Sequence, residues 1–343
     1  MRRLSACVAL LLLAFLVPAR GWDHEGHQLV GSIADQLLAG HPAEKQIESI
    51  LGFKLRIAAT WPDCARSIKP QKDGSFSFVY DPEHPEYTAP CPPFLLGAER
   101  PRLEDYVARN WNNCAYSEGE LNEKKGCHET YHFADVPIHR NRYYLGYAGT
   151  NEHDIVQAIN AAIAVLKGEL PRPPFSIKDK KEALFLLAHF VGDLHQPLHV
   201  GGVYLDSKGK PVEPDTPADV KKDQETFGGN ALYDGRVPLH VIWDDTPKEL
   251  GTRANAALVS DARAVPPTSG DIGGWAAAWA SESLIASQGA FADLTFDEKG
   301  QRGWDIKFKD RTTYLAMVPK VQRERIILAG ARLAALLKAV WPQ

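Results

Sequence analysis

The chain has 343 residues, of which 44% are hydrophobic and 24% charged, and its formal net charge at pH 7 is −4. This is the composition of an ordinary globular protein, long enough to bury one large core or two smaller ones. The acidic balance argues against a basic nucleic-acid groove of the usual sort, although bound divalent cations can supply the positive charge that side chains lack.

The first predicted element is a secretory signal over residues 1–21. Two arginines precede the apolar run ACVALLLLAFLV, which is too short to span a bilayer comfortably, and a small-x-small cleavage site follows it. We expect cleavage after Gly21, so that Trp22 begins a mature chain that is secreted or periplasmic. Loss of three arginines then lowers the formal charge from −4 to about −7. Because no later stretch is apolar for long enough, we expect no membrane anchor.

Helical patterns dominate the rest of the chain. Apolar residues recur at helical spacing after DHEGH, and DIVQAINAAIAVLKGEL is capped by Asp154 and stopped near Gly168. DKKEALFLLAHFVGDLHQ is rich in helix formers until Pro197 ends or kinks it. WAAAWASESLIASQGAF and the amphipathic VPKVQRERIILAGARLAALLKAVW complete the set. We predict an all-α fold with one domain over residues 22–343, and we expect a monomer.

Two irregular regions interrupt these helices. Residues 67–102 are rich in proline, and DGSFSFVY within them is compatible with a short hairpin. Residues 201–229 are a charged loop that also contains proline. The rest of the chain has no repeats and no alternation of strands with helices, which supports the all-α prediction.

Four cysteines remain after the expected cleavage. An even number in an exported chain indicates two disulfides, with three possible pairings. Nearness in the sequence favours Cys114–Cys127 and then Cys64–Cys91.

The segment AHFVGDLHQPLHV carries the clearest chemical signal. His189 and Asp193 are four residues apart on a helix, so both side chains lie on one face and can bind one metal ion from consecutive turns. His199 follows Pro197, where a kink would turn its imidazole back towards the same centre. Burying an ionised aspartate in this apolar helix is costly unless a cation compensates it. His195 points elsewhere and is expected to be an ordinary core histidine.

Similar donors recur along the chain, in PLHVIWDD, TYHFADVP and ATWPDCAR. Imidazoles and carboxylates without a reactive cysteine are a ligand set for zinc. The donors exceed one tetrahedral site, which indicates two or three ions sharing a carboxylate: His27, Asp63, His132, His189, Asp193, His199, His240 and Asp244. The remaining histidines in loops or polar stretches are expected at the surface: His41, His84, His128, His139 and His153.

In order, these motifs resemble the trinuclear-zinc single-strand nucleases of the S-one/P-one type. The resemblance rests on Trp22 to His27, WPD, HFAD, HFVGDLHQPLH, GGN, LHVIWD and WASES, and it runs to about residue 338. It implies an all-α fold and three Zn²⁺ ions per chain. The first ion would be bound by Asp63, His132, His189 and Asp193, the second by His199, His240 and Asp244, and the third by His27, Asp193 and the free α-amino nitrogen and carbonyl oxygen of Trp22.

The resemblance also implies an endonuclease that hydrolyses single-stranded RNA and DNA to 5′-phosphorylated products, with 3′-nucleotidase activity as a further expectation. Asp63 would orient or deprotonate the attacking water, and Arg66 would contact the phosphate, unless it is a plain surface arginine. Phe133 would stack on an unpaired base, unless it is a core residue, and Asp135 would accept hydrogen bonds from the base edge. Asn230 is a further candidate for substrate binding.

Two insertions separate this chain from the family pattern, at about residues 67–127 and 201–227. Both leave from predicted ligands and could roof or narrow the cleft. Two other functions stay open. A zinc-dependent phospholipase C shares the helical zinc scaffold but typically has Glu where this chain has Asp244. A non-catalytic zinc-binding protein predicts complete coordination with no position left for a substrate.

Overall fold

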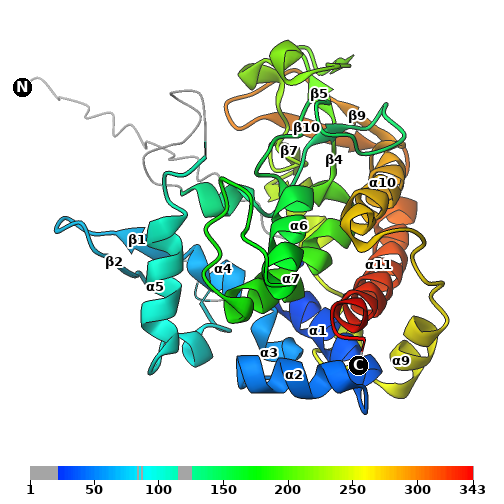
Figure 1. Cartoon of the computed structure of the whole chain (residues 1–343). Helices are drawn as coiled ribbons and strands as arrows, with labels where there is room; N and C mark the ends of the chain where they lie inside the picture. Colours follow the sequence, from blue (N-terminus) through cyan, green and yellow to red (C-terminus); the bar gives the residue numbers. More distant parts are fainter. Residues whose placement is uncertain (1–21, 83–84, 86–87, 115–125, 343) are drawn as a thin grey trace, which may run out of the picture.

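The computed structural model describes residues 22–82, 85, 88–114 and 126–342. The predicted signal segment, residues 1–21, therefore lies outside the described residues. Helices make up most of the described chain, as predicted, and Figure 1 shows them gathered around α7. None of the described helices is both long and apolar enough to cross a membrane.

Helix α7 (Lys180–His195) is the centre of the fold. The side chain of Asp179 caps it by accepting hydrogen bonds from the backbone N–H groups of Lys181 and Glu182. Every residue from Glu182 to His195 is buried, which is typical of a helix surrounded by others. The helix ends at His195, as its sequence predicts, and a short 3-10 turn (Pro197–His199) follows.

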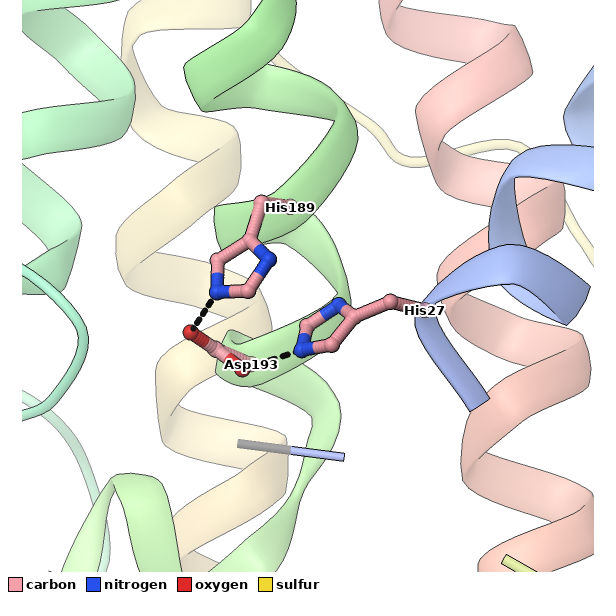
Figure 2. A group of neighbouring side chains, drawn as sticks. All are labelled: His27, His189 and Asp193. Carbon is pink, nitrogen blue, oxygen red and sulfur yellow. Dashed lines mark ion pairs between the residues drawn. The ribbon is translucent and has the colours of Figure 1, made fainter. Parts of the chain in front are cut away.

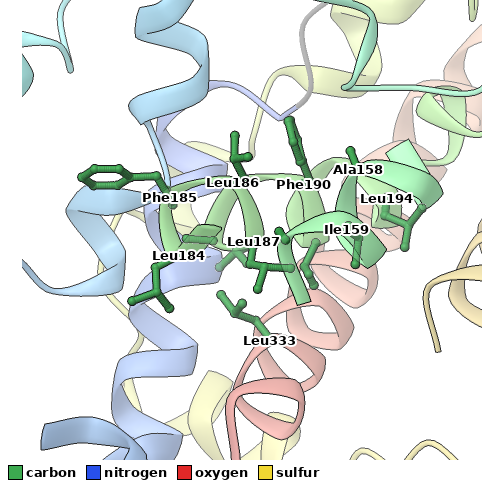
Figure 3. Packing of buried hydrophobic residues seen from close by; sticks show 14 of the residues in the cluster. Ala158, Ile159, Leu184, Phe185, Leu186, Leu187, Phe190, Leu194 and Leu333 are labelled. Atoms are coloured by element: carbon green, nitrogen blue, oxygen red, sulfur yellow. The ribbon is translucent and has the colours of Figure 1, made fainter. Parts of the chain in front are cut away.

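Three long helices and one shorter helix surround α7: α1 (His24–Leu38), α6 (Ile155–Leu166), α10 (Ile272–Phe291) and α11 (Arg311–Val340). Figure 3 shows Leu187 and Phe190 of α7 near Ile159 of α6 and Leu333 of α11. Helices α1 and α11 approach closely at Gly330, where a Cβ would lie 2.6 Å from the Cβ of Ile33. This packing fixes α1 beside the central helix, and α1 carries His27.

The shorter helices flank this core. The predicted irregular region, residues 67–102, contains the predicted hairpin, which is confirmed as β1 (Ile68–Pro70) paired with β2 (Phe76–Phe78). It ends in the first turn of α5, a helix that the sequence did not predict. The other short helices are α2 (Pro42–Leu51), α3 (Leu55–Ala58), α4 (Trp61–Ala65), α5 (Glu99–Arg109), α8 (Leu239–Asp244) and α9 (Ala256–Arg263).

Short strands lie at one end of the helical core (Figure 1). A four-stranded sheet has the order β8-β7-β10-β9, with β7 and β10 parallel. Two further pairs join β3 to β4 in parallel and β5 to β6 antiparallel. The bounds are β3 (Val136–Pro137), β4 (Gly201–Gly202), β5 (Tyr204–Leu205), β6 (Pro211–Val212), β7 (Leu232–Asp234), β8 (Val237–Pro238), β9 (Leu294–Phe296) and β10 (Trp304–Phe308).

The β3–β4 pair brings HFAD next to the end of the central helix. The backbone N–H of Ala134 donates to the carbonyl of His199 over 2.8 Å, and that of Val136 donates to the carbonyl of Val200 over 2.8 Å. Segments more than sixty residues apart in the sequence are thereby held at one place.

Two disulfides form, Cys64–Cys91 and Cys114–Cys127, which confirms the pairing that sequence nearness favours. The Cα atoms of Cys64 and Cys91 are 5.5 Å apart, within the usual range for a disulfide. Cys64 directly follows Asp63 on α4, so this bridge ties a predicted ligand to the first predicted insertion.

Candidate metal centre

The predicted ligands converge at three adjoining groups of side chains. In each group the donor atoms lie within 4.8 Å of one another, and they come from α1, α4, α7, α8 and the turns that follow α7 and the 3-10 helix Cys127–Thr130. The groups are His27, His189 and Asp193; Asp63, His132 and His189; and His199, His240 and Asp244.

Asp193 lies at the middle of the first two groups. Its Oδ1 lies 3.2 Å from Nε2 of His27, and its Oδ2 lies 3.0 Å from Nε2 of His189 (Figure 2). Nδ1 of His132 lies 2.9 Å from the same Oδ2, and Oδ1 of Asp63 lies 3.8 Å from Nε2 of His189. Because its two oxygens face different partners, this carboxylate can bridge two cations.

The third group contains two imidazoles that face each other. Nδ1 of His199 donates to the carbonyl of His132 over 2.7 Å, and Nδ1 of His240 donates to the carbonyl of Gly228 over 2.7 Å. Since a carbonyl only accepts, the proton of each neutral ring is on Nδ1 and each Nε2 carries a lone pair. The two Nε2 atoms lie 3.0 Å apart, and Oδ2 of Asp244 lies 3.4 Å from Nε2 of His240. Lone pairs so close together are stabilised by a shared cation.

The buried donor atoms of the first two groups also indicate a bound cation. Both ring nitrogens of His27, Oδ1 of Asp63 and Oδ1 of Asp193 are buried and form no hydrogen bond within the described part of the chain. Native proteins rarely leave such atoms unsatisfied. A bound cation would satisfy Nε2 of His27 and the two carboxylate oxygens, so the residues present fit a metal cluster.

The pKa values of the carboxyl groups depend on what faces them. Burial alone would raise the pKa of Asp193, but the facing imidazoles of His189 and His199 lower it well below its usual value. Burial raises the pKa of Asp244 well above its usual value, and the negative charge of Asp193 adds to this effect. Burial lowers the pKa of His132 to about 4, which keeps that imidazole neutral and able to bind a metal.

Trp22 is fully buried beside the central helix. Its Nε1 donates to the carbonyl of Gly192 over 3.0 Å, and Gly192 directly precedes Asp193. A Cβ at Gly192 would lie 3.1 Å from Nδ1 of His27. The first residue after the predicted cleavage site is therefore anchored by its side chain next to the candidate centre.

Two residues that hold this arrangement were missed by the sequence reasoning. The backbone N–H of Asp23 donates to the carbonyl of Asp244, and its side chain accepts from the N–H groups of Gly26 and Thr246. Gln196 donates to Oδ1 of Asp244 over 2.6 Å. The sequence could have indicated both residues. Asp23 is a typical N-cap residue ahead of α1, and Gln196 stands between two predicted ligand positions in DLHQPLH.

Of the predicted substrate residues, Arg66 lies beside the second donor group, and Phe133 directly follows His132 in the chain. Nη1 of Arg66 is buried without a hydrogen bond within the described residues and lies 3.7 Å from Oδ1 of Asp63. Phe133 is half-buried. Asn230 donates to the carbonyl of Phe227, while its own buried Oδ1 forms no hydrogen bond within the described residues.

Asp135 is in an unusual environment for a carboxyl group. Burial and the nearby carboxylate of Glu225 raise its pKa to about 7, although a hydrogen bond from the backbone of Gly228 opposes this rise. The side chain therefore changes charge near neutral pH, unlike an ordinary aspartate.

Asp135→Asn is expected to stabilise the protein at pH 8 but not at pH 4. A carboxyl group with a pKa of about 7 in the folded chain and 3.8 in the unfolded chain lowers the free energy of unfolding as pH rises between these values. Because asparagine does not ionise, the variant does not lose this stability, and its melting temperature should exceed that of the wild type by about 2 °C or more at pH 8. Thermal melts at both pH values check this, and an equal difference at the two would contradict it.

Some expected surface histidines are buried. The prediction is wrong for His128 and His153, because each ring packs against a residue from another part of the chain. The ring of His128 packs 5.9 Å from that of Trp111, and Nδ1 of His153 shares a 3.1 Å hydrogen bond with Thr130. His84 lies outside the described residues.

His195 is the core histidine that the sequence predicts. Its Nδ1 donates to the carbonyl of Val191 over 2.7 Å, and its Nε2 accepts from Arg332 over 2.9 Å. Both ring nitrogens are used, so His195 does not belong to the metal centre.

A family model described as S1/P1 Nuclease matches residues 103–341, more than half of the chain. The chain belongs to this family. The matched segment contains six of the candidate ligands, from His132 to Asp244, whereas Trp22, His27 and Asp63 precede it.

Among curated proteins, this S1/P1 nuclease family member is similar to Endonuclease 1 of Arabidopsis thaliana. The two are 22% identical over 254 residues, which are 71% of this chain and 59% of the relative. The chain thus matches less than two thirds of the relative's length, and the all-α fold agrees with membership of the family.

Proposed function

We propose that this chain is an exported zinc-dependent endonuclease. It hydrolyses single-stranded RNA and DNA to 5′-phosphorylated products and also acts as a 3′-nucleotidase. The observation that carries the proposal is the convergence of three groups of imidazoles and carboxylates, with Arg66 3.7 Å from Asp63 and with Phe133 and Asp135 in the segment that follows His132. Membership of the S1/P1 nuclease family supports the same reaction class.

Three zinc ions would account for the donors. Nitrogen and oxygen donors suit zinc, and the four described cysteines are in disulfides and so do not compete as ligands. Asp193 is the ligand that two sites would share. The proposed sets are Asp63, His132, His189 and Asp193; His199, His240 and Asp244; and His27, Asp193 and Trp22, the last through its α-amino nitrogen and carbonyl oxygen.

Zinc in such a cluster supplies Lewis acidity and makes hydroxide available near neutral pH. Asp63 orients the attacking water by accepting its hydrogen bond. The guanidinium of Arg66, 3.7 Å from Asp63, donates to a phosphate oxygen and stabilises charge that develops on it. Its buried Nη1 forms no hydrogen bond within the described residues, which supports a role in binding an anion.

A preference for single strands follows from the proposed base site. Phe133 offers a ring face for stacking, which is worth about 1–3 kcal/mol per base. Asp135 accepts hydrogen bonds from the base edge, and the buried Oδ1 of Asn230 provides another acceptor. In a duplex these base faces are stacked and paired, so double-stranded substrates would have to be opened first.

Export is part of the proposal, because both disulfides are typical of an oxidising compartment. The leader over residues 1–21 would direct the chain to the periplasm or outside the cell, where it acts as a monomer without a membrane anchor.

The test is a product assay with single-stranded, duplex and phosphatidylcholine substrates, combined with metal counting. We expect 5′-phosphorylated nucleotides from single strands, slower cleavage of duplexes, and about three zinc ions per chain. Release of diacylglycerol and phosphocholine without nucleotide products would overturn the nuclease proposal in favour of a phospholipase C. Full zinc loading with no turnover of any substrate would favour a zinc-binding protein.

A further inference from the structure

A loop that begins and ends beside Asp135 has no assigned role. We call residues 138–150 the aromatic loop. The backbone N–H of Asp135 donates to the carbonyl of Gly149 over 3.0 Å. Gly149 has a φ of +75°, and a Cβ there would lie 2.0 Å from the carbonyl oxygen of Asp135, so only glycine permits this closure. The base of the loop is thereby fixed against the proposed base site.

The tip of the loop presents aromatic and basic side chains to solvent. Tyr144 is 58% exposed and the neighbouring Leu145 42%. The rings of Tyr144 and Tyr147 are 5.4 Å apart, and the guanidinium of Arg142 lies 5.8 Å from the ring centre of Tyr144. That of Arg140 lies 4.3 Å from the ring of Tyr147. Exposed rings flanked by guanidinium groups are the usual composition of a surface that binds single-stranded nucleic acid.

Hydrogen bonds hold the loop that carries the exposed ring of Tyr144, while the neighbouring Tyr147 is half-buried against the core. The hydroxyl of Tyr143 donates to Asp154 over 2.8 Å, and its backbone N–H donates to Oγ of Ser281 over 3.0 Å. The N–H of Gly146 donates to Oγ1 of Thr150 over 2.9 Å. A loop held at both its middle and its end offers rings that are already placed, so binding loses less conformational entropy.

The two arginines differ in what they can bind. Arg140 forms an ion pair with Asp215 of the second predicted insertion. Arg142 is exposed and forms no ion pair with any residue that the structure describes. In a chain with a formal charge of −4, an exposed guanidinium without a carboxylate partner is complementary to a phosphate.

We propose that the aromatic loop is a second binding site for the single-stranded substrate. Tyr144 stacks on a base flanking the cleaved nucleotide, and Arg142 binds a neighbouring phosphate. This inference rests on the proposed nuclease function, because it extends the path of the strand away from Phe133 and Asp135. A substrate too short to reach the loop gains nothing from it.

The test compares a dinucleotide with a single strand of about ten nucleotides, a length within the range that such surfaces cover. Tyr144→Ala should raise KM for the long strand about five-fold or more and leave kcat and dinucleotide cleavage unchanged. Tyr144→Phe keeps the ring and should behave as the wild type. Leu170→Ala, which truncates a side chain 90% exposed between α6 and α7, is the surface control.

Arg142 is tested by the salt dependence of binding. Fluorescence anisotropy of a labelled phosphorothioate strand gives Kd at several salt concentrations. Loss of one phosphate contact in Arg142→Ala should lower the slope of log Kd against log salt by about 0.7, whereas Arg142→Lys keeps the charge and most of the slope.

Equal KM values and slopes in wild type and variants would overturn the inference while leaving the nuclease proposal intact. The inference would also be overturned if Tyr144→Ala lost binding to phosphatidylcholine vesicles but bound the single strand as well as the wild type does. If the wild type cleaves neither substrate, the nuclease proposal fails, and the anisotropy measurement still decides whether the loop binds a single strand.

Discussion

Replacing Asp193 by alanine is expected to abolish the metal centre and to reduce hydrolysis of single strands by more than about 100-fold. Changes in residues that merely orient a ligand cost about 10- to 100-fold, and Asp193 faces three imidazoles directly. Without the carboxylate, His27, His132 and His189 would face one another without a negative charge between them. Zinc content by mass spectrometry and initial rates on single-stranded DNA measure the two effects.

Asp193→Ala could also lose activity because it fails to fold, and a second variant distinguishes this from loss of the metal. Asp193→Asn keeps the shape of the side chain but not its charge, so it should fold and still lose zinc and activity. Asp261→Ala, which removes an exposed carboxylate of α9, should keep both. A folded Asp193→Asn protein with wild-type zinc content and rate would refute the shared-ligand model.

A chain that retains one residue before Trp22 is expected to bind about one zinc ion fewer and to lose most of its activity. The α-amino nitrogen of Trp22 is a metal ligand only when free, since a peptide bond turns it into a non-basic amide. The side chain is already fixed, with its indole nitrogen 3.0 Å from the carbonyl of Gly192. The added residue would therefore lie at the centre itself and could not move aside.

Two preparations test this dependence on the first residue. One is cleaved to begin at Trp22 and the other at Gly21, and each is purified through a C-terminal tag so that only the first residue differs. Zinc per chain and the rate on single-stranded RNA are compared. Equal zinc contents and rates would show that the amino group is not a ligand.

Local patterns predicted the central helix correctly, and they placed His189 and Asp193 on one of its faces. Helix α7 has a capping aspartate, strong helix formers and a proline just after its end, so its bounds follow from neighbouring residues. His189 and Asp193 share a face because they are four residues apart on it. Spacing alone did not join Asp63 and His132 to this face; only the family resemblance predicted that contact.

The parts that the sequence did not predict depend on distant contacts. The strands of the four-stranded sheet are two to five residues long, too short for a periodic pattern, and β7 pairs with β10 from a remote segment. His128 has polar neighbours in the sequence but packs under Trp111 after the chain folds back. The aromatic loop also had no helical or strand pattern, and its exposure became visible only in the structure.

The Cys64–Cys91 bridge has a consequence for the order in which the centre is completed. It closes a loop of 27 residues and ends one residue from Asp63, so oxidation restricts the position of a ligand. A reducing compartment leaves these thiols unbridged, and α4 is then held by packing alone. In the proposed exported enzyme, oxidation and metal loading would thus be coupled through one short helix, and the centre would be completed only outside the cytoplasm. The cell's own RNA would be spared in the meantime.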